Sequence, residues 1–316
     1  MSDAPASAPV RHAPRAALED RSFRELTASD STGRLRVRKT CKLYVGGAFP
    51  RSESGRSYPV RAADGSLLAY AAQASRKDLR DAVVAARAAA KAWSSASPYN
   101  RGQVLYRVAE MLEGRREQFV SEVRAAENVT ADSAANQVDA AIDRWVHYAG
   151  WADKFSQLAG ATNPVSGPYV CFSSPEPTGV VGVFAPQDSS LLGLVSVLAP
   201  VLTTGNTAVL IASQDHPLPA VSLAEALATS DLPSGTVNIL TGHTAELAPW
   251  MAAHRDINAL DLTGVAPESR PALQRTGADN LKRVYVPRDT DWLADPRTGR
   301  LSAFVEVKTV WHSQGA

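Results

Sequence analysis

The stretch that decides the fold runs from residue 179 to residue 286 and opens with Gly179-Val-Val-Gly-Val-Phe-Ala185. Four further short runs rich in β-branched residues follow, at 207–211, 236–240, 257–262 and 281–286. Helices are predicted between these runs, at 191–204, 218–229 and 245–254. Strands that alternate with helices predict an α/β fold, a Rossmann-like doubly wound parallel sheet with helices on both faces. Ligands bind outside the carboxyl ends of such strands, so the expected binding loops are 186–190, 212–217, 242–246 and 263–268.

Short strands and a helix are predicted upstream of this sheet. The strands lie at 42–49 and 57–70, each with glycine-containing turns. Ser75 and Asp78 have the spacing of a helix-capping box, and the alanine-rich helix that they begin runs to Trp93.

Two more helices complete the upstream part. Ser97-Pro98 places a capping hydroxyl before a first-turn proline, and apolar residues at helical spacing follow. A third helix is predicted from about 131 to 158, and its aromatic side chains, including Trp145 and Trp151, are interpreted as packing residues. Residues 1–38 are rich in Ala, Pro, Ser and Arg and are predicted to be a disordered tail.

The composition excludes several classes of protein. A chain of 316 residues with 45% hydrophobic side chains can bury a sizeable core, and its net charge of +1 does not favour nucleic acid or an anionic membrane. The longest apolar run, 191–202, falls short of the roughly 18 residues that span a bilayer. The N-terminus has no apolar stretch of the kind found in signal peptides, so we expect a cytoplasmic protein.

Cysteines and histidines predict no metal site. Cys41 and Cys171 have no CxxC spacing and are interpreted as reduced, structural residues. The histidines at 147, 216, 243 and 254 show no spacing typical of metal ligands.

Several motifs in a fixed order together resemble the aldehyde dehydrogenase superfamily. They are Leu43-Tyr-Val-Gly-Gly47, Tyr148-Ala-Gly-Trp-Ala-Asp-Lys154, Glu176-Pro-Thr-Gly-Val-Val-Gly182, Leu198-Ala-Pro200 through Gly205-Asn-Thr207, and Leu262-Thr-Gly264. The resemblance continues to Val286 and resumes at Glu306-Val-Lys-Thr-Val310, which is similar to the C-terminal strand of the family.

The resemblance implies a domain organisation without a catalytic domain. Residues 39–287 would form the NAD(P)-binding domain, with a bridging hairpin at about 159–175 inside it. Residues 288–302 would be a linker in place of the catalytic domain, and 303–316 the C-terminal bridging strand, which with the hairpin makes a small three-stranded oligomerisation sheet. A linker of this length cannot replace a domain of about 50 to 250 residues.

The groups that oxidise an aldehyde in the family have no counterpart here. The family's nucleophilic cysteine lies downstream of Leu-Lys-Arg-Val, and no cysteine follows Cys171. Its catalytic base lies in Glu-Leu-Gly-Gly, where this chain has Pro287-Arg-Asp-Thr290. The asparagine of its oxyanion site is replaced by Asp188, whose carboxylate would repel the oxyanion. No catalytic residue is therefore predicted.

The cofactor contacts are also altered. Where the family reads Leu-Lys-Pro-Ser-Glu, this chain has Leu210-Ile-Ala-Ser-Gln214, and the Thr-Gly-Ser turn becomes Thr263-Gly-Val265. Five positions remain as vestigial cofactor-binding candidates: Ala185, Pro186, Ser213, Thr263 and Gly264. We expect no cofactor, or at most weak NAD(P) binding.

The leading hypothesis is a pseudoenzyme that acts as a structural or regulatory subunit, similar to the truncated, non-catalytic C-terminal half of the aldehyde dehydrogenase 16 family. The expected partner is a full-length aldehyde dehydrogenase in a hetero-oligomer, or a second copy in a homodimer held by the helix around Trp145 and Trp151. One alternative is an NAD(P)-dependent aldehyde oxidoreductase whose catalytic groups come from a partner subunit. Another is a nucleotide-binding regulatory module.

Overall fold

The computed structural model describes residues 39–288 and 290–315, so the predicted tail at 1–38 lies outside the described residues. The chain divides into two units, Met1–Lys39 and Thr40–Ala316, and the fold below is that of the second. Within the described residues no helix is both long enough and apolar enough to cross a bilayer.

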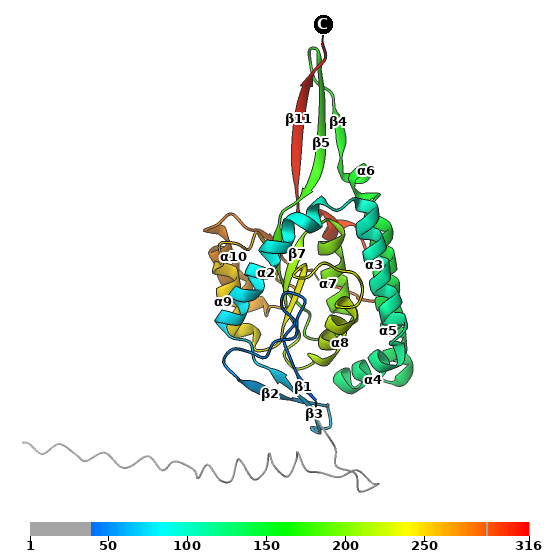
Figure 1. Ribbon diagram of the computed structural model, residues 1–316, viewed down its shortest axis with the longest axis vertical. Helices are drawn as coiled ribbons and strands as arrows, with labels where there is room; N and C mark the ends of the chain where they lie inside the picture. The colour runs from blue at the N-terminus through cyan, green and yellow to red at the C-terminus, as the bar shows by residue number, and fades with distance from the viewer. Residues whose placement is uncertain (1–38, 289, 316) are drawn as a thin grey trace, which may run out of the picture. The chain divides into compact units, whose positions relative to one another are not determined.

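The centre of the fold is a five-stranded parallel sheet, as the alternating pattern predicts (Figure 1). Its strand order is β10-β9-β6-β7-β8, and every pair of neighbours is parallel. The strands are β6 (Val180–Phe184), β7 (Thr207–Ile211), β8 (Val237–Leu240), β9 (Ala259–Asp261) and β10 (Arg283–Tyr285). All residues of β6 to β9 are buried, which is why these runs are apolar on both faces.

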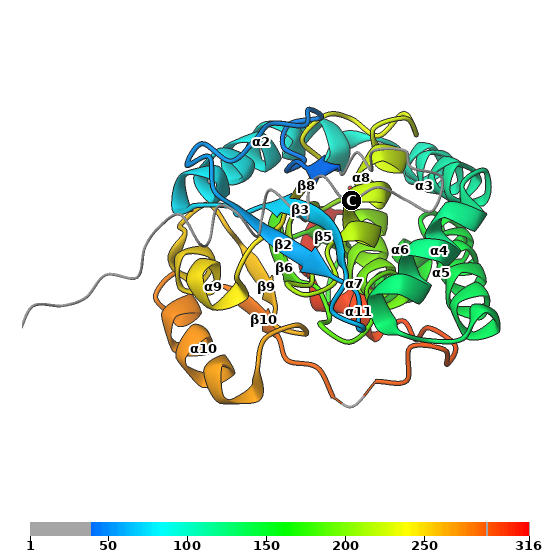
Figure 2. The same cartoon turned by 90° about the horizontal axis from the view of Figure 1, so that it is seen from below.

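Helices cover both faces of this sheet (Figure 2). On one face lie α3 (Pro98–Glu113), α5 (Ala131–Trp151), α7 (Leu192–Thr203) and α8 (Leu218–Leu227); on the other lie α2 (Arg76–Ser95), α9 (Thr244–Ala253) and α10 (Arg270–Ala278). Alternate side chains of β6 divide between the two layers: Val181 and Val183 pack with the first set, Val180 and Phe184 with the second. The doubly wound architecture is therefore confirmed.

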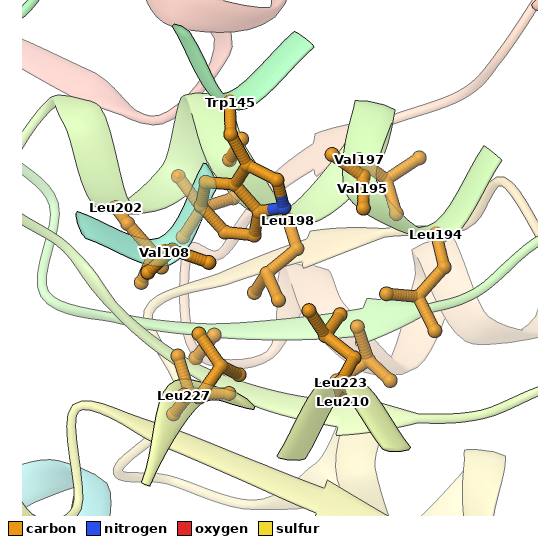
Figure 3. Packing of buried hydrophobic residues seen from close by; sticks show 14 of the residues in the cluster. Val108, Trp145, Leu194, Val195, Val197, Leu198, Leu202, Leu210, Leu223 and Leu227 are labelled. Atoms are coloured by element: carbon orange, nitrogen blue, oxygen red, sulfur yellow. The ribbon is translucent and has the colours of Figure 1, made fainter. Parts of the chain in front are cut away.

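The largest core cluster centres on α5 and α7 (Figure 3). Trp145 of α5 is fully buried in the same cluster as Leu198 and Leu202 of α7. The indole of Trp145 is enclosed by the chain's own core, and the homodimer expected at the helix around Trp145 and Trp151 stays a prediction. Trp151, one turn and a half further on, is only partly buried against the same cluster.

The N-terminal part differs in places from its prediction. A small sheet with order β1-β3-β2 contains β1 (Thr40–Cys41), β2 (Ser57–Arg61) and β3 (Leu67–Ala72). Residues 42–49 form isolated bridges, Tyr44 with Ile239 and Val45 with Ala48, and not the predicted continuous strand. Ser75 and Asp78 make the capping box that begins α2, as predicted.

Two helical segments also depart from the sequence prediction. The third predicted helix ends at Trp151, and a separate short helix, α6 (Phe155–Ala159), follows it. A further helix, α4 (Arg116–Glu127), is not among the predicted elements. Asn128 ends α4 in the left-handed conformation, which asparagine tolerates better than most residues.

The third sheet projects from the body of this unit (Figure 1). It has the order β11-β5-β4 and is antiparallel throughout. Its strands are β4 (Ala161–Asn163), β5 (Tyr169–Pro177) and β11 (Val305–Ser313). β11 pairs with β5 along its whole length, from Val305 opposite Pro177 to Ser313 opposite Tyr169. Within the described part of the chain, the other edge of β11 pairs with no strand.

The segment between β10 and β11 packs onto the body of the fold. It contains one short helix, α11 (Gly299–Ala303), and the side chains of Leu301 and Phe304 are fully buried in the main cluster. The side chain of Asn206 donates to the Phe304 carbonyl at 2.8 Å. Arg144 of α5 donates to the carbonyl of Trp292 at 2.8 Å and to that of Ala294 at 3.1 Å. The predicted linker is therefore a docked segment with its own buried contacts.

Candidate functional site

A cavity of about 750 Å³ lies at the carboxyl edge of the parallel sheet, beside the loops that follow β6, β7 and β9. Helices α9 and α10 form its walls together with the short 3-10 turn η1 (Pro267–Ser269). The lining residues are Gln187, Asp188, Gln214, Asp215, Thr244, Ala245, Ala248, Pro249, Thr263, Gly264, Val265, Ala266, Glu268, Ser269, Ala272 and Leu273. The position agrees with the binding edge expected from the sheet topology.

The turn after β9 touches the end of β6 at Gly264. Its amide donates to the carbonyl of Phe184 at 2.9 Å. A β-carbon at Gly264 would lie 1.8 Å from the carbonyl oxygen of Ala185, a distance that no side chain could occupy. Glycine is therefore required at position 264, because only glycine lets this turn pack directly against the backbone of Phe184 and Ala185.

The side chain of Gln187 ties the loop after β6 to the loop after β7. Its amide nitrogen donates to the carbonyl of Ala185 at 2.9 Å, and its amide oxygen accepts from the backbone of Gln214 at 2.9 Å. The Ser213 hydroxyl donates to the Gln187 carbonyl at 3.2 Å. These bonds join the loop after β6 to the loop after β7.

The five predicted site residues divide into two groups. Thr263 and Gly264 line the cavity, whereas Ala185, Pro186 and Ser213 are buried beneath its loops and do not line it. Sequence reasoning misses the contribution of Gln187 and of the start of α10. In the sequence, the motif Pro186-Gln-Asp188 is informative only through Asp188, which stands where the resemblance implies the oxyanion asparagine of the family. Nothing in the motif indicates that the side chain of Gln187 would join two loops.

The lining of this cavity is acidic. Asp188, Asp215 and Glu268 contribute three carboxylates, and the lining contains no lysine, arginine or histidine. Ile211, at which the resemblance implies a lysine in the family, is fully buried in the core of the sheet. A pyrophosphate needs cations or free amide donors, and carboxylates nearby oppose it. The residues present therefore do not fit a dinucleotide well.

A buried ion pair lies directly behind the turn. Asp261, the last residue of β9, is fully buried, and its carboxylate is 2.5 Å from the guanidinium of Arg300 on α11. The backbone amide of Thr263 donates to the Asp261 carboxylate at 3.0 Å, and the Thr263 hydroxyl also donates to it. Arg300 donates in addition to the Thr263 hydroxyl oxygen at 3.1 Å. We call this group the Asp261 cluster.

The Asp261 cluster joins the linker to the cavity. The guanidinium carbon of Arg300 is also 4.5 Å from the ring centre of Tyr285, so the cation is enclosed by a ring and a carboxylate. Burial raises the pKa of the Asp261 carboxyl, and the positive charge of Arg300 opposes that rise. The segment between β10 and β11 is thus hydrogen-bonded to the turn that lines the cavity.

The cavity offers no thiol, imidazole or amine. Both cysteines are buried elsewhere: Cys41 lies in the small N-terminal sheet, and Cys171 lies on β5, where its sulfur accepts from Asn163 at 3.5 Å. In the described part of the chain, no group of three or more metal-ligating side chains could hold a metal ion. Acyl transfer through a thiolate therefore has no nucleophile at this site.

Comparison with known proteins places the chain in a family. The model of the aldehyde dehydrogenase family matches residues 50–287, and the chain belongs to that family. Retinal dehydrogenase 2 of Homo sapiens is 31% identical over 261 residues, which cover 81% of this chain and 49% of that protein. Cytosolic 10-formyltetrahydrofolate dehydrogenase of Xenopus laevis is 30% identical over 254 residues, which cover 78% of this chain and 28% of that protein.

Solved structures give the same result. HpcC from Thermus thermophilus matches with a TM-score of 0.74 and 29% identity, covering 78% of this chain and 47% of that one. The NAD⁺ complex of aldehyde dehydrogenase from Bacillus cereus matches with a TM-score of 0.73 and 25% identity, covering 78% of this chain and 50% of that one. The chain thus spans half or less of the length of these relatives.

Proposed function

We propose that this chain is a non-catalytic member of the aldehyde dehydrogenase family that serves as a structural or regulatory subunit of a full-length aldehyde dehydrogenase. The observation that carries the proposal is the docked segment between β10 and β11. Leu301 and Phe304 are buried there and Arg300 is paired with Asp261, so the segment closes the fold at the place where the resemblance implies an inserted domain.

The absence of aldehyde oxidation follows from the groups that are missing. The cavity has no thiol to attack an aldehyde and no amide side chain at Asp188 to stabilise an oxyanion. Such groups act as a unit, so restoring one of them would recover little activity.

The proposal also includes weak NAD(P) binding or none. One structural neighbour is described as an NAD⁺ complex, which makes a dinucleotide plausible for the family fold. In this chain the three carboxylates of the cavity and the loss of the lysine at Ile211 oppose the anionic pyrophosphate.

The surface proposed for assembly is the projecting sheet. Val307 and Trp311 lie on the alternating strand β11 and are 62% and 58% exposed. An exposed edge strand with apolar side chains is an aggregation hazard unless a partner covers it. A dehydrogenase sheet that adds to this edge would supply backbone hydrogen bonds, and the alternate side chains would set the register.

The test is co-purification with a full-length aldehyde dehydrogenase from the same source. Changing Val307 and Trp311 together to lysine should abolish recovery of the dehydrogenase, because two charges would replace apolar side chains on one face of β11, beside the edge at which a partner strand would pair. Both side chains are mostly exposed, and the ring contact that Trp311 loses is with Tyr169, itself 45% exposed, so the far-ultraviolet circular dichroism spectrum should be unchanged. Removal of the whole 303–316 segment is a poorer test, because it deletes the buried Phe304.

The matched control is Val84→Lys. Val84 is 59% exposed on α2, far in sequence from the projecting sheet, and its change introduces the same kind of charge. Unchanged co-purification of the Val307→Lys/Trp311→Lys variant would refute assembly through β11. Loss of the complex in the Val84 variant as well would mean that added charge, and not the strand edge, is responsible.

A further inference from the structure

A second cavity, of about 650 Å³, lies between α2 and α9. Helix α9 also walls the first, acidic cavity, but the two cavities share no lining residue. The second cavity is bounded by the first turns of α2 and by the end of α9 with the residues that follow it. Its lining residues are Glu53, Ser75, Arg76, Lys77, Leu79, Arg80, Trp250, Ala253, His254 and Arg255. We call it the basic cavity, since four of these side chains are cationic at neutral pH.

The four cations differ in their pairing. Lys77 is 3.6 Å from Glu53, and Arg80 is 2.8 Å from Asp81, so these two have a counter-charge. Arg76 and Arg255 form no ion pair with any carboxylate among the described residues. The basic cavity therefore carries two guanidinium groups available to an anion, one from each of the two elements that bound it.

The indole ring of Trp250 lies beside these cations. Trp250 is 43% exposed, and the guanidinium carbon of Arg76 lies 3.9 Å from the centre of its ring. This contact holds Arg76 at the cavity in a defined position. Leu79 and Ala253 add apolar surface to the same lining. The basic cavity thus combines fixed positive charge with an apolar surface.

A fifth cation, outside the lining, is bonded to the backbone of the lining residue His254. Lys282 is buried, and its ammonium group donates to the carbonyl of His254 at 2.8 Å. It has no carboxylate partner among the residues that the structure describes, although buried charges are usually paired. Its charge adds to the positive potential at the basic cavity.

The site does not depend on the start of helix α2. The backbone amides of Lys77 and Asp78 already donate to the Ser75 hydroxyl at 3.1 and 3.3 Å. Recognition therefore has to come from the side chains of Arg76 and Arg255, which can each make two parallel hydrogen bonds to phosphate oxygens.

We propose that the basic cavity binds a phosphate monoester that carries an apolar or aromatic body. A monoester near neutral pH has a charge of about −2 and matches the two guanidinium groups of Arg76 and Arg255. The body of the ligand would lie along Trp250 and Leu79. This binding is independent of the assembly function proposed above, and it uses neither β11 nor the acidic cavity.

The experiment is titration calorimetry of the full chain with phenyl phosphate at low ionic strength, with inorganic phosphate in a parallel titration. Phenyl phosphate should bind at one site and more tightly than inorganic phosphate, because only it contacts Trp250. The Arg76→Gln/Arg255→Gln variant should weaken binding at least about tenfold, since each change removes charge-assisted hydrogen bonds. The control Lys91→Gln removes an exposed cation from the far end of the same helix and should leave binding unchanged.

Three results would overturn the proposal. One is the absence of saturable phenyl phosphate binding to the unaltered chain. Another is equal binding by the Arg76→Gln/Arg255→Gln variant, provided that its circular dichroism spectrum matches that of the unaltered chain. The last is binding of an acidic peptide at this cavity without binding of phenyl phosphate, which would assign the surface to a protein partner.

Discussion

Removing the cation of the Asp261 cluster tests whether the docked segment is an integral part of the fold. In Arg300→Met the methionine fills part of the space of the arginine side chain but leaves the carboxylate of Asp261 buried without its counter-charge. The two side chains are 10% and 0% exposed, so solvent screening is small. Breaking a buried pair by removing one partner costs about 3 to 5 kcal/mol. We expect the free energy of unfolding to fall by that amount in urea titrations followed by circular dichroism.

The loss should depend on pH in a defined direction. Burial already raises the pKa of Asp261, and removal of Arg300 takes away the main interaction that lowers it. In the folded variant the Asp261 carboxyl has a higher pKa than in the unfolded chain and so keeps its proton to a higher pH. The stability of the variant therefore falls as the pH rises from the pKa of Asp261 in the unfolded chain towards its raised pKa in the folded chain. The difference from the unaltered chain should therefore shrink as the pH is lowered.

The double change Asp261→Asn/Arg300→Met provides the control. It removes both charges, and because no charge is then left unpaired, it should cost less than Arg300→Met alone. A loss of under about 1 kcal/mol in Arg300→Met, with no dependence on pH, would refute a structural role for the cluster. It would mean that the segment between β10 and β11 is only loosely attached.

Three further changes test other parts of the account by the same unfolding measurement. Gly264→Ala should prevent normal folding or shift the turn, because its β-carbon would lie 1.8 Å from the Ala185 carbonyl oxygen; a normal transition would contradict the geometry of this turn. Leu198→Ala should cost about 2 to 5 kcal/mol, since it opens a hole in the core cluster that contains Trp145; a smaller loss would mean that the core relaxes around it. Ser75→Ala should cost about 1 kcal/mol through loss of the α2 cap, and no change would mean that the capping box is not formed in solution.

Local signals in the sequence account for most of the fold. Strands β6 to β9 of the central sheet are short, mostly apolar runs between helices, and their burial on both faces is visible in composition alone. The starts of α2 and α3 follow from Ser75 and Ser97, whose side chains accept from backbone amides of the first turn. These features depend only on neighbours in the sequence.

The missed elements lack such signals. No side-chain hydrogen bond caps α4 at Arg115, so nothing local marks its start. The helical spacing of apolar residues continues from Trp151 to Phe155, although the chain turns between them and begins α6. The short helix α11 is stabilised by burial of Leu301 and Phe304 and not by its own propensity.

The candidate site is predictable only in part for a similar reason. The predicted sheet topology locates the site at the carboxyl edge of the strands, and the Thr263-Gly264 motif identifies one part of its lining. The pairing of Asp261 with Arg300 joins residues 39 positions apart, and the acidic character of the cavity depends on which loops meet in space. No periodicity or local motif contains that information.

The most direct test of the central claim is an assay of the purified chain alone. Formation of NADH or NADPH would be followed with NAD⁺ and NADP⁺ over a series of aliphatic and aromatic aldehydes, beside a full-length aldehyde dehydrogenase as positive control. We expect no turnover above the enzyme-free rate, because the cavity has no thiol nucleophile and Asp188 replaces the oxyanion donor. Reproducible turnover that is abolished by Cys171→Ala would contradict the account, since it would show that this chain has a catalytic cysteine of its own.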